Sequence, residues 1–150
     1  MNPKIVTSDE GTRWNFMGDA VRIILRCEDT GGSFTLVQQR SAPGAGVPPH
    51  VHSREDETFQ IIEGKVEFQI GDRTVIAEAG TAVYAPKDLP HGFRVIGDEP
   101  ALMQILMVPG GLEKMFEEIV HLPPPLDPAS VEGICRRHGV EFVGHAPGAR

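Results

Sequence analysis

The sequence predicts an all-β protein, a small antiparallel β-barrel or jelly roll followed by a helical C-terminal extension. Between Val21 and Val108, short runs rich in β-branched and aromatic residues alternate with Gly, Pro and Asp, a pattern typical of strands joined by turns. No helical pattern of about 10–15 residues interrupts this region, so a parallel sheet with crossover helices is disfavoured. The 17 glycines and 13 prolines of the chain fit many short connections.

Eight strands are expected in this region, at residues 20–28, 33–40, 58–64, 65–71, 73–80, 81–86, 91–97 and 101–110. The segments EGK and GDR have the composition of tight turns. They predict a pair of hairpins that join strands of about five residues each.

Two helices and a last short strand are predicted after the barrel. Residues 110–122 place apolar side chains at helical spacing, namely Leu112, Met115, Phe116 and Ile119. The proline-rich segment 123–128 cannot continue that helix and forms a stiff connector. Asp127 is a suitable N-cap for a second helix that begins at Pro128 and ends near Gly139. The segment VEFVG then predicts the short strand.

The length of 150 residues indicates a single domain over 1–150, with a barrel core of about 20–109 and an extension of about 110–150. We expect the extension to pack on the barrel or on a second subunit.

The net charge of −7, without a Lys/Arg cluster, argues against nucleic acid and anionic membranes as binding partners. There is neither a run of about 20 apolar residues nor a signal-peptide pattern, so a cytoplasmic location is expected. Cys27 and Cys135 are read as reduced thiols.

Histidines and a carboxylate carry the candidate chemistry. His50 and His52 point to the same face if the chain is extended there. Glu57 lies five residues after His52, so in an unbroken strand its side chain would point to the opposite face. The intervening segment SRED must therefore turn or bulge. His91 begins another strand after a proline-shaped turn. Three neutral imidazoles and one carboxylate suit a single divalent transition metal (Fe, Mn, Ni, Co, Cu or Zn) better than Ca²⁺.

Glycines and prolines frame these four side chains in a recognisable order. The cupin motif G-x5-H-x-H-x4-E-x6-G is matched at every named position, by Gly44, His50, His52, Glu57 and Gly64. The second cupin motif, G-x5-P-x-G-x2-H-x3-N, is matched at Gly80, Pro86 and His91, but Asp88 and Val95 replace its second Gly and its Asn. Gly is favoured where φ is positive, a region that Asp tolerates better than most residues. The turn before His91 is therefore the part of the motif whose geometry the sequence leaves open.

From about Val21 to Ile119 the chain resembles small single-domain cupins related to quercetin 2,3-dioxygenase. The resemblance implies a small β-barrel, a homodimer and a metal bound by His50, His52, Glu57 and His91. Open positions on the metal would take water or a small-molecule substrate, and Glu57 would also be catalytic by accepting a proton from a substrate hydroxyl. The implied activity is an O₂-dependent dioxygenase for a small aromatic or enol-type compound. A metal-dependent isomerase or epimerase and a non-catalytic small-ligand binder are the alternatives.

Further residues are candidates for the surroundings of this site. If Glu57 faces inward, alternation places Phe59 and Ile61 inward as well, either as pocket lining or as core. Gln38, Gln104 and Arg40 are polar residues within strand-like runs, where they would orient a ligand or lie on the outer face.

The remaining polar and sulfur-containing side chains favour simpler interpretations. Glu55 and Asp56 are expected in a solvated loop. The methionines at 103, 107 and 115 are expected to fill the core or an interface. Three histidines without partners at ligand spacing are expected on the surface or at helix ends: His121, His138 and His145.

Overall fold

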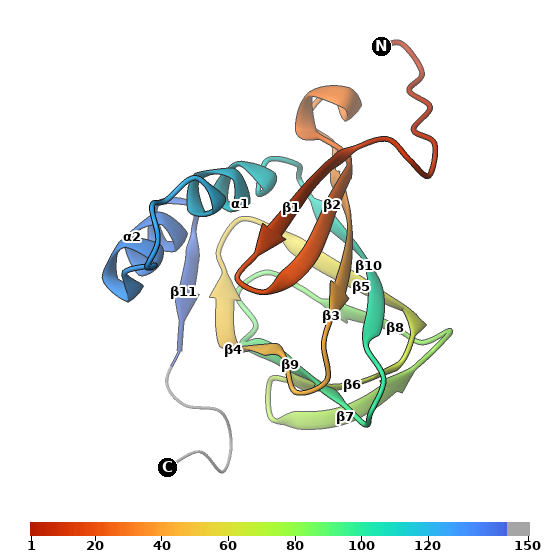
Figure 1. Cartoon of the computed structure of the whole chain (residues 1–150), viewed down its shortest axis with the longest axis vertical. Helices are drawn as coiled ribbons and strands as arrows, with labels where there is room; N and C mark the ends of the chain where they lie inside the picture. The colour runs from red at the N-terminus through yellow and green to blue at the C-terminus, as the bar shows by residue number, and fades with distance from the viewer. Residues whose placement is uncertain (144–150) are drawn as a thin grey trace.

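Two antiparallel sheets face each other in the computed structural model, which describes residues 1–143 (Figure 1). The strands are β1 (Thr12–Phe16), β2 (Asp19–Leu25), β3 (Thr35–Ser41), β4 (Gly46–His52), β5 (Asp56–Glu63), β6 (Lys65–Ile70), β7 (Arg73–Glu78), β8 (Ala82–Ala85), β9 (His91–Ile96), β10 (Ala101–Val108) and β11 (Val140–Phe142). The six-stranded sheet has the order β1-β2-β3-β10-β5-β8, and the five-stranded sheet has the order β11-β4-β9-β6-β7. This arrangement confirms the predicted all-β, antiparallel jelly-roll class.

All eight predicted strands are present. Strands β1 and β4 lie outside the eight predicted ranges, and one predicted turn differs. The six-stranded sheet begins with β1, before the expected start of the barrel near residue 20. The GDR hairpin between β6 and β7 is confirmed, but EGK does not close a hairpin. It carries the chain from one sheet to the other, because β5 pairs with β8 and β10 whereas β6 pairs with β7 and β9. Gly64 makes this passage at φ +85°, where a Cβ atom would lie 2.6 Å from the carbonyl oxygen of Pro100.

The core fills the space between the two sheets. Strand alternation directs every second side chain inward, and the largest fully buried apolar residues are Phe68, Ile23, Ile61, Met103, Met107 and Ile119. The rings of Phe59, Phe68 and Phe93 form a cluster within this core, with centroids 5.1–6.0 Å apart. Such pairs contribute beyond the apolar area that they bury. The methionines at 103, 107 and 115 are buried, as predicted.

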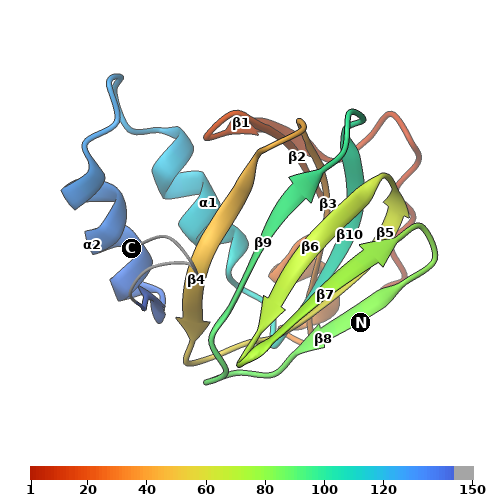
Figure 2. The same ribbon diagram turned by 90° about the horizontal axis from the view of Figure 1, so that it is seen from below.

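The C-terminal extension packs on the barrel, which was one of the two expected placements. Helices α1 (Glu113–Val120) and α2 (Pro128–Arg137) lie side by side at one edge of the sandwich, where α1 contacts β1 and α2 contacts β11 and lies outside α1 (Figure 2). Met115 and Ile119 of α1 are buried in the core, and Phe116 packs on Phe16 with centroids 4.7 Å apart. The predicted cap of α2 is confirmed, because the Asp127 carboxylate accepts a hydrogen bond from the Ser130 amide at 3.3 Å. Strand β11 then pairs with β4.

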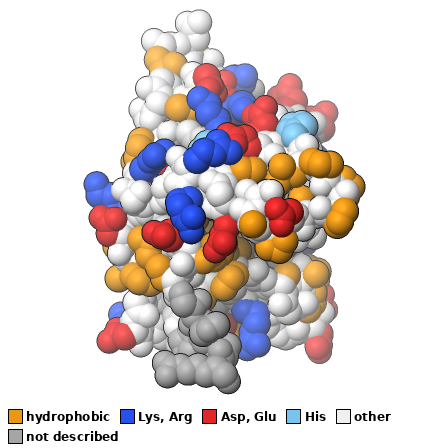
Figure 3. Space-filling view, turned by 90° about the vertical axis from the view of Figure 1, so that its left-hand side faces the viewer, with side chains coloured by type: hydrophobic (Ala, Val, Ile, Leu, Met, Phe, Trp, Pro, Cys, Tyr) orange, Lys and Arg blue, Asp and Glu red, His pale blue; other side chains and the backbone are white. Residues whose placement is uncertain are grey.

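The surface around the helices carries charges of both signs. Acidic and basic side chains are interspersed on this face (Figure 3), and several are paired, such as Arg137 with Glu118 at 2.7 Å. Both cysteines are free thiols. None of the helices formed by residues 1–143 is long and apolar enough to cross a membrane. The homodimer and the cytoplasmic location stay predictions.

A buried carboxylate ties the extension to the barrel. Glu113, which is 0% exposed, is the first residue of α1. Its two oxygens accept hydrogen bonds from the Cys27 amide at 2.7 Å, the Thr35 hydroxyl at 2.6 Å and the Gly111 amide at 3.1 Å. A charge can be buried at tolerable cost only when its hydrogen-bonding capacity is used in this way. Glu113 therefore connects the segment before β3, β3 itself and the end of β10.

We predict that Glu113→Ala lowers the free energy of unfolding by about 3 kcal/mol, because it leaves buried donors without an acceptor. Urea denaturation of the metal-free protein measures this change. Glu117→Ala is the matched control, since Glu117 pairs with Arg26 at 2.8 Å on the surface of the same helix. We expect the control to lose less than about 1 kcal/mol. If both variants lost the same free energy of unfolding, the buried contacts of Glu113 would contribute no more to stability than a surface ion pair.

Candidate metal centre

Four side chains that are distant in the sequence converge between the two sheets. One potential ligand atom from each of His50, His52, Glu57 and His91 lies within 4.8 Å of those of the other three, and all four residues are buried. The predicted convergence is therefore confirmed. No other group of three or more His, Cys, Asp or Glu residues within the described chain meets the same criterion.

The strand pairing explains why these residues meet. His50 and His52 lie on β4, and His91 lies directly opposite His50 on the neighbouring β9, so that their side chains share one face. Glu57 lies on β5 in the facing sheet. The imidazole ring of His50 is 4.5 Å from that of His91 and 4.9 Å from that of His52, measured between centroids. The cluster thus joins the two layers of the sandwich.

Local irregularities of the backbone bring the ligands into place. The β4–β9 register shifts between Val47 and His50, and the chain turns between β4 and β5, as the SRED segment predicts. Strands β4 and β9 approach so closely that a Cβ atom on Gly92 would lie 2.8 Å from the carbonyl oxygen of Val47. Asp88 adopts φ +68°, and its amide donates to the carbonyl oxygen of His52 at 2.8 Å. Asp88 thus adopts the positive φ that Gly would favour at this position of the motif.

Two of the imidazoles are oriented by backbone carbonyls. Nδ1 of His50 is 2.9 Å from the carbonyl oxygen of Pro48, and Nδ1 of His91 is 3.1 Å from that of Leu89. A carbonyl oxygen only accepts hydrogen bonds, so Nδ1 carries the proton in both rings and the lone pair remains on Nε2. Nε2 of His91 lies 3.5 Å from Oε1 of Glu57, and Nε2 of His52 is in direct contact with the same oxygen.

Charge interactions shift the pKa values inside the cluster. Burial, together with the neighbouring His91 and His52, lowers the pKa of His50 to about 4. Burial also opposes the charged form of His52, but the Glu57 and Glu55 carboxylates outweigh it and raise the pKa of His52 to about 9. Burial acts to raise the pKa of Glu57, but contacts with His52 and His91 hold it well below its usual range. At neutral pH the cluster therefore contains a carboxylate beside an imidazolium, and His50 is neutral.

The cluster contains polar atoms that lack hydrogen-bond partners. Within residues 1–143, the buried side-chain nitrogen and oxygen atoms without such a partner are His52 Nδ1 and Nε2, Glu55 Oε1, Glu57 Oε1 and His91 Nε2. Buried polar atoms are nearly always satisfied, and three of these atoms, His52 Nε2, His91 Nε2 and Glu57 Oε1, face one another within the group of converging residues. Ligand atoms about 2.1 Å from a shared ion lie at most about 4.2 Å apart. A contraction of about half an ångström from the observed 4.8 Å would therefore suffice. The residues fit a transition metal.

Aromatic side chains surround the donor atoms. Phe59, on the same face of β5 as Glu57, packs its ring 6.0 Å from that of His91. Ile61 continues this buried face one step deeper. On the other side, Phe142 of β11 lies 5.9 Å from the ring of His50, measured between centroids. Strand alternation predicted Phe59 and Ile61 but not Phe142, because the position of Phe142 depends on the pairing of β11 with β4.

Gln38 and Gln104 do not line the interior. They lie opposite each other on β3 and β10, at positions that alternate with buried residues, and therefore face outward. Arg40 is exposed on the same face and pairs with Glu63 at 3.3 Å. The inward residue is Gln39, whose amide donates to the Asp19 carboxylate at 2.9 Å. A one-residue difference in strand register decides which glutamine faces the core.

The expectation that Glu55 is solvated is wrong. The turn between β4 and β5 folds the Glu55 side chain inward, where it is 7% exposed and its Oε1 lies 3.4 Å from Nδ1 of His52. Asp56 is half-buried and accepts a hydrogen bond from the Lys87 amide at 2.8 Å. His121 is exposed beside the end of α1, and His138 is half-buried beside Glu118. His145 lies outside the described residues.

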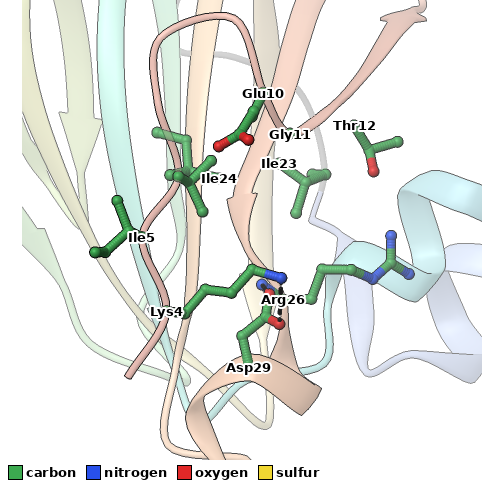
Figure 4. Close-up of a pocket in the computed structure, with 10 residues that line it drawn as sticks. Lys4, Ile5, Glu10, Gly11, Thr12, Ile23, Ile24, Arg26 and Asp29 are labelled. Atoms are coloured by element: carbon green, nitrogen blue, oxygen red, sulfur yellow. Dashed lines mark hydrogen bonds and ion pairs between the residues drawn. The ribbon is translucent and has the colours of Figure 1, made fainter. Parts of the chain in front are cut away.

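A separate depression of about 380 Å³ lies between the N-terminal segment and β2 (Figure 4). Its lining includes Lys4 and Asp29, which pair with each other at 3.4 Å. Arg26 contributes a backbone amide that donates to the Asp29 carboxylate at 2.9 Å. None of the four converging ligands belongs to its lining. This surface therefore takes no part in the candidate metal centre.

Comparison with known proteins agrees with the fold and the motifs. Residues 37–109 match the family model for the cupin domain. The chain is 26% identical over 118 residues to quercetin 2,3-dioxygenase of Bacillus subtilis. This alignment covers 78% of this chain but only 34% of that protein. The chain thus spans about a third of the length of that relative.

Two further comparisons cover most of the length of the similar protein. The chain is 29% identical over 112 residues to the polyketide synthase CurC of Streptomyces cyaneus, covering 73% of this chain and 71% of CurC. Among solved structures, KdgF from Halomonas sp. superposes with a TM-score of 0.67 at 19% identity, over 75% of this chain and 99% of KdgF. The last comparison concerns the fold alone. The two sequence motifs, the domain match and the jelly-roll architecture together identify residues 37–109 of this chain as a cupin domain.

Proposed function

We propose that this protein is a metal-dependent dioxygenase that acts on a small aromatic or enol-type compound. The observation that carries the proposal is the convergence of three imidazoles and one carboxylate whose facing atoms include several without hydrogen-bond partners. The likeness to a quercetin 2,3-dioxygenase supports the choice of reaction class. In this proposal His50, His52, Glu57 and His91 hold one divalent first-row metal.

In this proposal the residues of the site have separate roles. The three histidines bind through neutral nitrogens, and backbone carbonyls fix the rings of His50 and His91. Glu57 accepts the proton of a substrate hydroxyl when the substrate binds. The ring of Phe59 gives the site an apolar wall that suits an aromatic compound and excludes water. The bound metal would supply Lewis acidity for the ionised substrate and a site where substrate and O₂ meet.

Phosphorylated substrates fit this site less well. A sugar-phosphate isomerase or epimerase needs basic side chains around the phosphate. The buried charged and polar residues of the described chain include no Lys or Arg. This absence favours an uncharged or weakly acidic substrate.

We predict that the metal-loaded protein consumes O₂ with a flavonol such as quercetin, and that Glu57→Gln lowers kcat by about 100-fold or more through loss of the base. An oxygen electrode and product analysis measure both. Glu63→Gln, an equal change of charge on the exposed end of β5, is expected to keep full activity. No oxygen uptake with flavonols, diketones and catechols would refute the dioxygenase, and turnover under strict anaerobiosis would favour an isomerase instead.

We also predict that metal affinity rises with pH. The raised pKa of His52 means that the ring is protonated below about pH 9 in the metal-free protein, and the metal must displace this proton. The affinity should therefore increase about tenfold per pH unit between pH 6 and 8. His50, with a pKa of about 4, adds no dependence in this range.

Competition with a chelator of known proton affinity measures this slope. The same titrations show how many protons are released, if they are repeated calorimetrically in buffers with different ionisation enthalpies. An affinity independent of pH over this range, with no proton released, would contradict the assigned charge of His52.

A further inference from the structure

We propose that Glu55 is a positioning residue of the metal centre, which orients His52 and contributes a second negative charge beside it. Glu55 occupies an unspecified position of the first cupin motif, between His52 and Glu57, and is not one of the four converging residues. This inference rests on the proposed metal centre but does not depend on the dioxygenase activity.

The first observation is the difference between the three imidazoles. Nδ1 of His50 and Nδ1 of His91 each face a backbone carbonyl oxygen at 2.9 and 3.1 Å. Nδ1 of His52 faces instead the Oε1 atom of Glu55 at 3.4 Å. This separation is slightly longer than the upper end of an N–H···O hydrogen bond, about 3.2 Å. A small rotation of the Glu55 side chain would close it.

The second observation is the placement of two carboxylates on the two nitrogens of one ring. Glu57 contacts Nε2 of His52, and Glu55 faces Nδ1. Because these nitrogens lie on different edges of the imidazole, Glu55 faces away from the shared centre. It therefore cannot replace Glu57 as a ligand without a rearrangement of the turn. A carboxylate in this position fixes the proton on Nδ1 and leaves Nε2 free for the metal.

The third observation is the burial of Glu55. Its side chain is 7% exposed, and Oε1 has no hydrogen-bond partner. Among the ion pairs of the described chain, the one that includes Glu55 is with His52. A buried charge without a partner is costly, so the turn would be more stable with an apolar residue if Glu55 served only to fill space. Its position is explained if His52 is held as a donor to Glu55.

A positioning role has measurable consequences for metal binding. Outer carboxylates that accept a hydrogen bond from a ligand histidine typically change metal affinity by about 10–100-fold. The negative charge of Glu55 also adds to that of Glu57. The two carboxylates and three neutral imidazoles then balance the charge of a divalent ion.

The test measures Co²⁺ and Zn²⁺ affinity by chelator competition for wild-type protein, Glu55→Ala and Glu55→Gln. The visible absorption spectrum of the Co²⁺ forms is recorded in parallel. We expect Glu55→Ala to bind both ions about 10–100-fold more weakly and to alter the Co²⁺ spectrum. Glu55→Gln should be intermediate, because the amide oxygen still accepts from Nδ1 while the charge is lost.

Two further variants separate positioning from general destabilisation. Glu63→Gln removes an exposed charge from β5 and should bind Co²⁺ as wild type does. Glu113→Ala destabilises the fold at a site outside the cluster, so it shows how much affinity is lost through stability alone. The inference is overturned if Glu55→Ala binds Co²⁺ within twofold of wild type with an unchanged spectrum. It is also overturned if Glu55→Ala loses no more affinity than Glu113→Ala at equal loss of stability.

The outcome for wild-type protein distinguishes this inference from the proposed function. Wild-type protein that binds Co²⁺ but consumes no O₂ in its metal-loaded forms refutes the dioxygenase, and the affinities of the Glu55 variants still decide the present inference. Wild-type protein that binds neither ion refutes both.

Discussion

Placing a carboxylate and three imidazoles between two apolar sheets is the constraint on which the rest of this structure depends. Each group would lose favourable hydration on burial, and an uncompensated charge there is unstable. The structure compensates by placing Glu57 of one sheet against His52 and His91 of the other. Three of the atoms that remain without partners, His52 Nε2, His91 Nε2 and Glu57 Oε1, face one another. A bound cation would satisfy these atoms together. The metal-free arrangement therefore already indicates a cation site.

Several elements keep this polar centre enclosed. The phenylalanine cluster fills the barrel behind His91, and β11 extends the five-stranded sheet beside His50. Helix α1 closes the open edge of the sandwich through its buried residues, and Glu113 anchors the start of that helix to β3. The C-terminal extension is thus part of the enclosure of the site. This explains how a small barrel can hold a polar cluster in an otherwise apolar interior.

The sequence was informative where chemistry follows spacing along the chain. The four converging side chains and the turn after His52 could be predicted, since local geometry and the cupin motifs determine them. The positive φ at Asp88 was left open, because Gly is the usual residue at that position of the motif. The outward orientation of Gln38 depended on a register that only the pairing with β10 reveals. The burial of Glu55 depends on how a short turn folds against the barrel. The passage of EGK between sheets likewise requires knowledge of which strands pair.

The backbone contacts of His50 and His91 have a consequence for how this centre can change during evolution. A main-chain carbonyl is present whatever residue occupies its position, so substitutions at Pro48 or Leu89 leave the accepting oxygen in the chain. The contact to His52 is encoded by a side chain and can be altered by a single codon. Natural variation or laboratory selection that adjusts the metal without replacing a ligand would therefore be concentrated at position 55.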